Sequence, residues 1–208
     1  MKKFPTLEAA ALLVSAAILA AAVRSHQDGN SGLMPEMKSF PVSRSSVERL
    51  CIKESAGSPC HGAIFEAFDY LCPPCHARFS SVEADMVKYP QFEWGLLPFP
   101  LSMHKESYQC ALAGYEALRT GTFRSFLTCT MATQVILFSG PTYYFQTAPK
   151  DVKFDWLSRN EARRIYAHTL NAIKKLPITY TPCFIAFNPE GSAIGTDSIG
   201  KALDFAGG

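Results

Sequence analysis

Two cysteines, Cys72 and Cys75, stand three positions apart in the run Cys-Pro-Pro-Cys, and this spacing suits thiol-disulfide chemistry. Sulfurs at that spacing can meet within one turn of a helix and close a disulfide. The attacking species in such chemistry is the thiolate, so the surroundings of the reactive cysteine must make it acidic. We predict that Cys72 is the nucleophile and that Cys75, turned towards the protein, is the resolving thiol.

Two elements must position the pair, a strand and a helix. Residues 64–71 are strand-like and residues 76–89 have a helical pattern, so the cysteines fall at a strand-to-helix junction. A helix begins with unpaired N–H groups and the positive end of its dipole, and both stabilise a thiolate at the first turn. The junction therefore predicts that the Cys72 thiolate is stabilised relative to its thiol.

The N-terminal segment, residues 1–24, predicts export. Lys2 and Lys3 precede an apolar stretch at 9–23, which ends at Arg24. An apolar stretch of this length is short for a membrane span and suits the core of a signal peptide, and its Ala-rich end offers a cleavage site. The segment is either cleaved or kept as an anchor in the inner membrane. In both cases the rest of the chain is expected in the periplasm, where disulfides persist.

The remainder predicts an α/β domain. Apolar residues make up 48% of the 208, enough for a sizeable core, and a net charge of +2 without a basic cluster argues against nucleic-acid binding. Residues 25–46 are rich in Ser, Gly and Pro and predict a linker, which leaves 47–208 for the domain, with a helical insertion at about 102–176. Strands are predicted at 47–53, 64–71, 92–97, 183–187 and from 193, and helices at 76–89, on both sides of Thr120-Gly121, at 158–175 and at 198–205.

These features together resemble the thioredoxin superfamily, and within it the DsbA-like branch of exported thiol-disulfide oxidoreductases. The shared residues are Cys72 and Cys75 after a strand, Glu66 six positions before Cys72, and the pair Thr181-Pro182 at the head of a late strand. The resemblance implies that Glu66 is a buried carboxyl that relays the proton of Cys75, and that Pro182 is cis, so that the Thr181 backbone binds a substrate strand. It also implies that no cofactor is needed, that the substrates are unfolded or disulfide-containing proteins, and that a redox partner recycles the cysteine pair.

The dipeptide between the cysteines departs from that of the family's strongest oxidants, which carry a histidine there. Pro73 and Pro74 have no N–H, so the Cys75 N–H is the main backbone donor left for the Cys72 sulfur. We therefore expect a thiolate that is less stabilised than in those oxidants, although a protonated His76, one turn away, would restore part of the effect. The direction of electron flow, oxidase or reductase/isomerase, stays open on these grounds.

Five further cysteines raise the question of structural disulfides. Cys51 and Cys60 flank a turn, and Cys110 and Cys129 lie at similar distances from the Thr120-Gly121 break, so both pairs are candidates for a bridge. Cys183, next to Pro182, is expected to be a buried inert thiol.

Other polar residues near the motif are expected at the surface. His61, His104 and His168 have no metal-ligand spacing with one another and are expected on the surface or in loops. Asp69 follows a core phenylalanine in the strand pattern, so we expect its side chain to face solvent.

Three alternatives use the same central residues. Cys72, Cys75 and His76 also satisfy C-x-x-C-H, the attachment signature of a c-type haem, although haem attachment requires neither a buried strand in front nor a late Thr-Pro pair. A zinc site on these residues lacks a second C-x-x-C pair to complete four ligands, so no metal is expected. A non-catalytic, chaperone-like binding module would keep its function without either cysteine.

Overall fold

The computed structural model describes residues 39–55, 57–58, 61–104, 106–132 and 159–208. The predicted export segment, most of the predicted linker and Cys60 lie outside these residues. Within the described ranges, no helix combines the length and the apolar character needed to cross a membrane.

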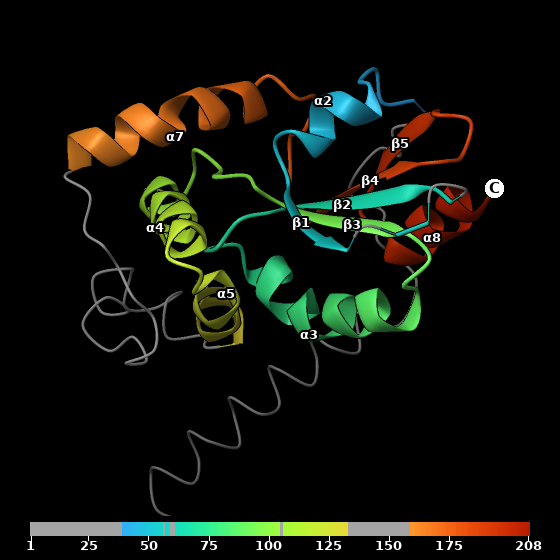
Figure 1. Ribbon diagram of the computed structural model, residues 1–208, viewed down its shortest axis with the longest axis horizontal. Coiled ribbons are helices and arrows are strands. Elements are labelled where there is room, and N and C mark those ends of the chain that lie inside the picture. The colour runs from blue at the N-terminus through green and yellow to red at the C-terminus, as the bar shows by residue number, and fades with distance from the viewer. Residues whose placement is uncertain (1–38, 56, 59–60, 105, 133–158) are drawn as a thin grey trace, which may run out of the picture. The chain divides into compact units, whose positions relative to one another are not determined.

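A five-stranded mixed sheet lies at the centre of the described chain, in the order β1-β3-β2-β4-β5 (Figure 1). Its strands β2 and β3 are parallel, and the other neighbouring pairs are antiparallel. A parallel pair needs a crossover connection, and helix α3 supplies it between β2 and β3. The segments that follow β2 and β3 therefore leave the sheet at the same edge. The strands are β1 (Ile52–Ser55), β2 (Ala63–Phe68), β3 (Glu93–Pro98), β4 (Cys183–Phe187) and β5 (Ala193–Thr196).

Both faces of the sheet are covered by apolar packing, which explains why every residue of β2 is buried. On one face, Ile64 of β2 packs in a cluster with Val82 of α3 and Ala202 of α8. On the other face, Phe65 belongs to a larger cluster that includes Val47 of α2. Figure 1 shows α3 and α8 on one side of the sheet and α2 on the other. The helices are α2 (Arg44–Glu48), α3 (Pro73–Lys88), α4 (Ser107–Arg119), α5 (Phe123–Ala132), α7 (Arg159–Ile173) and α8 (Ile199–Gly207).

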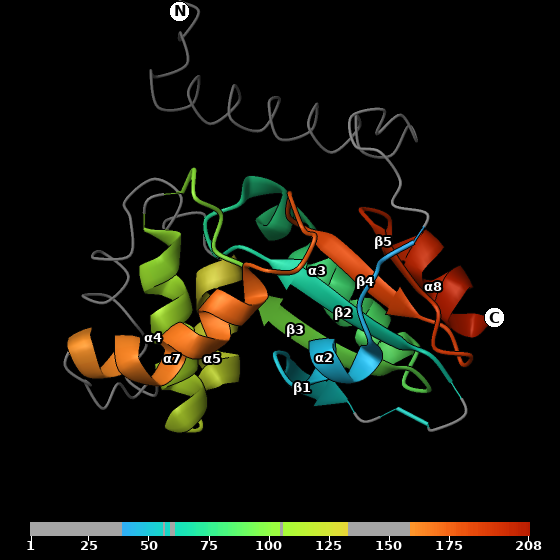
Figure 2. The same ribbon diagram turned by 90° about the horizontal axis from the view of Figure 1, so that it is seen from above.

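A helical insertion separates β3 from β4 along the chain and consists of α4, α5 and α7 in the described residues. Figure 2 shows these helices grouped at one end of the sheet. The predicted break between α4 and α5 is confirmed, and Gly121 there has φ +73°, a conformation that favours glycine. Tyr115 of α4 and Tyr166 of α7 stack with ring centroids 4.9 Å apart, which packs the third helix against the first.

The prediction of a first strand at 47–53 is wrong in its first half. Residues up to Glu48 form the short helix α2, and the strand begins only at Ile52. An ion pair between Arg44 and Glu48, 2.7 Å long, supports the helix, because residues four apart face each other on a helix.

Packed structure also begins earlier than predicted, within the range assigned to the linker. The Phe40 side chain is buried, and its ring fills the space that a Cβ at Gly195 would need. The Phe40 N–H donates to the Ala193 carbonyl at 2.9 Å, which joins this segment to β5. Residues from Phe40 onwards therefore belong to the packed domain.

Candidate active site

The two motif cysteines lie at the start of α3, directly after the turn that leaves β2. Cys72 is the N-cap residue, with Pro73 and Pro74 in the first turn of the helix. Proline is tolerated there because the first N–H groups of a helix have no intrahelical partner. Cys75 is fully buried, whereas Cys72 is 4% exposed and therefore reaches the surface only with a small part of its atoms.

The surroundings of Cys72 stabilise its thiolate. A hydrogen bond from the Cys75 thiol is the largest influence and lowers the pKa of Cys72; burial opposes it, and the Cys75 backbone N–H lowers the pKa further. The outcome is a pKa of about 6, well below that of an ordinary thiol. Cys72 is therefore largely a thiolate at neutral pH.

Cys75 is in the opposite situation. Burial raises its pKa strongly, and so do its hydrogen bond to the Cys72 sulfur and the negative charges of Cys72 and Glu66. The Cys75 proton therefore stays on its sulfur until a base removes it. This contrast gives the two cysteines different chemical roles, one as nucleophile and one as a thiol that reacts second.

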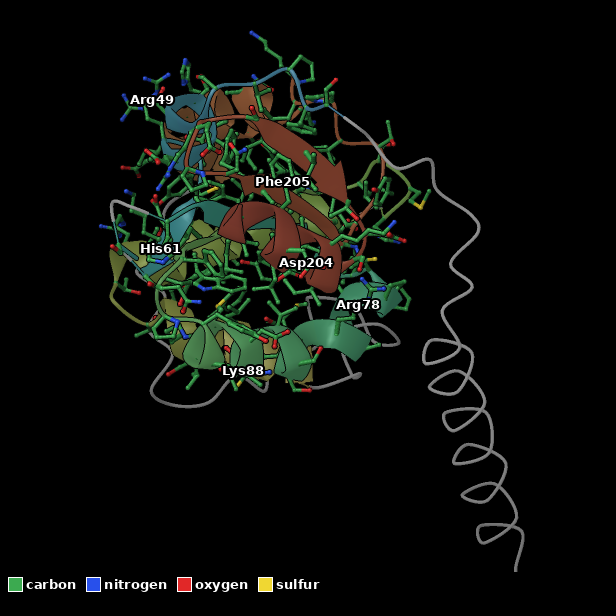
Figure 3. The ribbon with its side chains drawn as sticks, turned by 90° about the vertical axis from the view of Figure 1, so that its right-hand side faces the viewer. Arg49, His61, Arg78, Lys88, Asp204 and Phe205 are labelled. Atoms are coloured by element: carbon green, nitrogen blue, oxygen red, sulfur yellow. The ribbon has the colours of Figure 1, made fainter. Side chains whose placement is uncertain are left out.

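Glu66 lies in the middle of β2, opposite Leu96 on one side and Phe184 on the other. Burial raises the pKa of its carboxyl to about 8; Arg78 of α3 lowers this pKa and Cys72 raises it. The Arg78 guanidinium also donates to the Asp197 carbonyl. Figure 3 shows Arg78 on α3, near the helix α8 that carries Asp204. A carboxyl with a pKa near neutral can both accept and return a proton.

The segment before β4 brings Thr181 to the same sulfur. The Thr181–Pro182 peptide bond is cis. The Cys72 thiol donates to the Thr181 carbonyl, with the sulfur and oxygen 3.2 Å apart, although 109 positions separate the two residues along the chain. Thr181 is buried, so water has little access to this contact.

His76 does not provide the positive charge that was expected to stabilise the Cys72 thiolate. Its Nε2 lies 2.6 Å from the Tyr70 carbonyl oxygen, so the ring is turned back towards the turn before Cys72. Burial lowers the pKa of His76, which favours the neutral ring at neutral pH, although the hydrogen bond to the Tyr70 carbonyl and the charge of Asp69 oppose this. The stabilisation of the Cys72 thiolate therefore comes mainly from the hydrogen bonds of Cys75 rather than from an imidazolium.

Asp69 is buried, and the prediction that it faces solvent is wrong. The alternation of the strand ends with Phe68, so it no longer fixes the direction of the next side chain. His104, expected on the surface or in a loop, is only partly exposed and places Nδ1 2.9 Å from Asp69 Oδ2. Sequence reasoning missed this contact because the two residues are 35 positions apart and share no motif.

Neither predicted structural bridge is present among the described residues, and Cys110 is a free thiol. The Cys110–Cys129 bridge stays a prediction, and the Cys51–Cys60 bridge involves a residue outside the described ranges. Burial raises the pKa of Cys183 to about 11, which makes it a poor nucleophile. Among the described residues, no three His, Cys, Asp or Glu side chains are grouped so that they could hold a metal ion.

Comparison with known proteins places this arrangement in a known fold. No protein-family model matches the sequence, and no curated protein sequence does. A thioredoxin-like oxidoreductase from Silicibacter pomeroyi matches the structure with a TM-score of 0.58 and 20% identity, over 78% of this chain and 96% of that chain. A periplasmic thioredoxin-like protein from Salmonella enterica serovar Typhimurium gives 0.57 and 15%, over 79% and 95%. A linker-deletion mutant of ScsC from Proteus mirabilis gives 0.55 and 15%, over 96% and 87%.

Proposed function

We propose that this chain, which has the thioredoxin-like fold of DsbA-type proteins, is an exported thiol-disulfide oxidoreductase that exchanges disulfides with protein substrates. The observation that carries the proposal is the contrast between the two motif cysteines. The pKa of Cys72 is lowered to about 6, whereas that of its buried neighbour Cys75 is raised. A pair of this kind separates attack from resolution, which disulfide exchange requires.

The reaction needs no cofactor, because sulfur atoms carry the electrons. In the reducing direction, the Cys72 thiolate attacks a substrate disulfide, which forms a mixed disulfide and releases one substrate sulfur as a thiolate. Cys75 then gives its proton to Glu66 in its ionised form, which is the minority form at neutral pH, and attacks the Cys72 sulfur. This step forms the Cys72–Cys75 disulfide and releases the second substrate sulfur as a thiolate. In the oxidising direction the same steps run backwards, and protonated Glu66 supplies the proton to the departing Cys75 sulfur.

Substrate binding is assigned to the region around the Cys72 sulfur. The Thr181 backbone lies against this sulfur and offers hydrogen bonds that do not depend on the substrate's side chains. Pro73 and Pro74 are exposed and present an apolar rim beside it. We therefore assign unfolded or disulfide-containing proteins as substrates, with a separate redox partner that recycles the pair after each turnover.

The N-terminal sequence and the fold neighbours support an exported location. Residues 1–24 have the charge and apolar pattern of an export segment, and one neighbour is described as periplasmic. Export to an oxidising compartment suits a protein that handles disulfides. We assign the domain to the periplasm.

The acidity of Cys72 bears on the direction of flux. Its pKa of about 6 lies between the values of roughly 7 for thioredoxin and roughly 3.5 for the strong oxidant DsbA. Pro73 and Pro74 remove two backbone donors, which supports the proposal that the thiolate is stabilised less than in the strongest oxidants. The reduction potential of the pair decides between oxidase and reductase or isomerase.

The haem alternative is disfavoured by the positions of its own ligands. Thioether attachment needs both sulfurs, but Cys75 is fully buried. The axial ligand would be His76, but its Nε2 already contacts the Tyr70 carbonyl. A visible absorbance spectrum distinguishes the two functions, because covalent haem gives a Soret band and a cysteine pair does not.

A Cys75→Ala chain is expected to accumulate a mixed disulfide with a protein substrate. Cys72 still attacks, but the thiol that would resolve the intermediate is missing. The measurement is a non-reducing gel of the reduced variant mixed with an oxidised, unfolded model protein, which should show a band that disappears on reduction. The matched control replaces both Cys72 and Cys75 by alanine and should show no such band. Equal bands in the variant and the control would overturn the proposed function.

A further inference from the structure

Asp69 connects two segments that leave the sheet at the same edge. Its backbone carbonyl accepts from the Cys72 N–H at 3.1 Å, and its Oδ1 accepts from the Leu71 N–H at 2.8 Å. These bonds shape the turn that ends at the reactive sulfur. The Asp69 side chain thus belongs to the short connection that carries Cys72 from β2 to α3.

The same carboxylate binds the connection between β3 and α4. Oδ2 accepts from the Leu101 N–H at 2.8 Å and lies 2.9 Å from His104 Nδ1, and the Ser107 hydroxyl donates to Oδ1. Asp69 and Ser107 have no exposed surface, so water does not compete for these bonds. The carboxylate therefore ties the Cys72 turn to the start of the helical insertion.

Four groups surround the two carboxylate oxygens of Asp69 within hydrogen-bond distance: the Leu71 and Leu101 N–H groups, the Ser107 hydroxyl and His104 Nδ1. Such a set of donors suits an anion. An ionised carboxylate only accepts hydrogen bonds, and the two backbone N–H groups can only donate them. A buried anion acts over several ångströms, because the protein interior screens charge poorly. The Cys72 sulfur lies three residues further along the same turn.

The thiolate of Cys72 and the carboxylate of Asp69 carry charges of the same sign. The Cys75 hydrogen bond lowers the pKa of Cys72, whereas burial and the like charge of Asp69 raise it, because both disfavour ionisation. For Cys110 on α4, burial is the main reason that the pKa is raised, and the charge of Asp69 adds to it. The field of Asp69 therefore reaches both segments that it connects.

We propose that Asp69 is a positioning residue for disulfide exchange, which holds the turn bearing Cys72 against the β3–α4 connection and opposes the negative charge that the sulfur acquires. The role in disulfide exchange rests on the proposed function. The physical claim is that Asp69 both fixes the position of Cys72 and limits how acidic its thiol becomes.

The test is an Asp69→Asn variant in which the alkylation rate of Cys72 is measured against pH by peptide mass spectrometry. Asparagine keeps the shape and removes the charge, so the pH midpoint of Cys72 alkylation should move down, and at a pH about one unit below the wild-type midpoint the thiolate fraction should rise by about threefold. A purely structural role predicts no shift, or an upward shift as the sulfur loses its donors; either result would overturn the inference.

A Ser107→Ala variant is the matched control, because it removes one hydrogen bond from the same carboxylate and leaves the charge in place. Its midpoint should stay at the wild-type pH. If the Asp69→Asn chain does not fold, His104→Lys replaces it by setting a cation against Oδ2, and the midpoint should again move down; an unchanged midpoint would count against the inference. Alkylation needs no protein substrate, so the midpoint can be interpreted even if the chain proves not to exchange disulfides. Conversely, an unchanged midpoint would overturn the role of Asp69 and leave the proposed function untouched.

Discussion

A Cys72→Ser chain should exchange disulfides with a protein substrate about a thousandfold more slowly than the wild type, or not at all. The serine hydroxyl is close in size to the thiol, so the turn before α3 is expected to keep its shape. It is not ionised at neutral pH and cannot form a disulfide, whereas Cys72 has a pKa of about 6 and is largely a thiolate. The measurement is the rate of reduction or oxidation of a model protein, followed by the appearance of its free thiols or its disulfides.

Cys51→Ser is the matched control for this prediction. Cys51 is half-buried and burial raises the pKa of its thiol, so it is not a nucleophile at neutral pH. Its replacement should leave the rate within about a factor of two of wild type, as for substitutions away from a functional group. A chaperone-like module would behave differently, because binding of unfolded chains would survive replacement of Cys72 and Cys75 together. Full exchange activity in Cys72→Ser would remove the basis of the account.

The reduced wild-type protein should lose stability as the pH rises towards 8, and replacing Glu66 by glutamine should abolish this loss. Burial raises the pKa of Glu66 to about 8 in the folded state, whereas an unfolded carboxyl titrates at about 4.3. A raised folded pKa means that the stabilising proton is fully bound below the unfolded pKa, and that this contribution is lost as the pH rises towards 8. The loss between about pH 5 and about pH 8 is on the order of 3 kcal/mol. Urea unfolding at these two pH values measures it, and the Gln variant should not show the loss.

Glu93→Gln, on the neighbouring strand β3, is a control in which the pKa shift and its effect on stability have the opposite sign. Burial raises the pKa of Glu93, but hydrogen bonds from Arg44 and Lys53 outweigh it and hold the pKa below its usual value. Its charge therefore stabilises the fold above the unfolded pKa, and this stability is lost as the pH falls through the folded pKa. Glu93→Gln should thus destabilise the protein at neutral pH. Equal pH dependence in wild type and Glu66→Gln would show that Glu66 is not a protonated buried acid.

Glu66→Gln also tests the proton relay directly. Glutamine cannot accept the Cys75 proton, so resolution of the mixed disulfide should slow by about a hundredfold, while the first attack by Cys72 keeps its rate. Single-turnover kinetics separate these two steps.

Local sequence was sufficient for the centre of the site. The strand and helix patterns around Cys72 and Cys75 predicted a junction that the structure contains. The burial of Glu66, which the structure also shows, was implied only by the family resemblance. Thr181 could be connected to Cys72 only through the family resemblance, because nothing in the intervening sequence specifies that contact. The structure supplies it as a hydrogen bond to the Thr181 carbonyl.

The errors arose where a local pattern ended. The α2 helix is one turn long, too short for a periodic signal, although the spacing of Arg44 and Glu48 was a usable sign of helix. Asp69 stands one residue past β2, where strand alternation no longer applies. Its partners His104 and Ser107 lie on the far side of α3 and β3 in the sequence, so only the three-dimensional packing identifies them. The same holds for Arg78, whose link to Asp197 spans 119 positions.

A glutathione redox titration of the purified chain, with Cys72 and Cys75 followed separately by alkylation and mass spectrometry, tests the central claim most directly. We expect both cysteines to convert together in one two-electron transition, with a slope of about 30 mV per tenfold change in the ratio of oxidised to reduced protein. Independent conversion of the two cysteines, or two thiols that stay open to alkylation at every glutathione ratio, would contradict it.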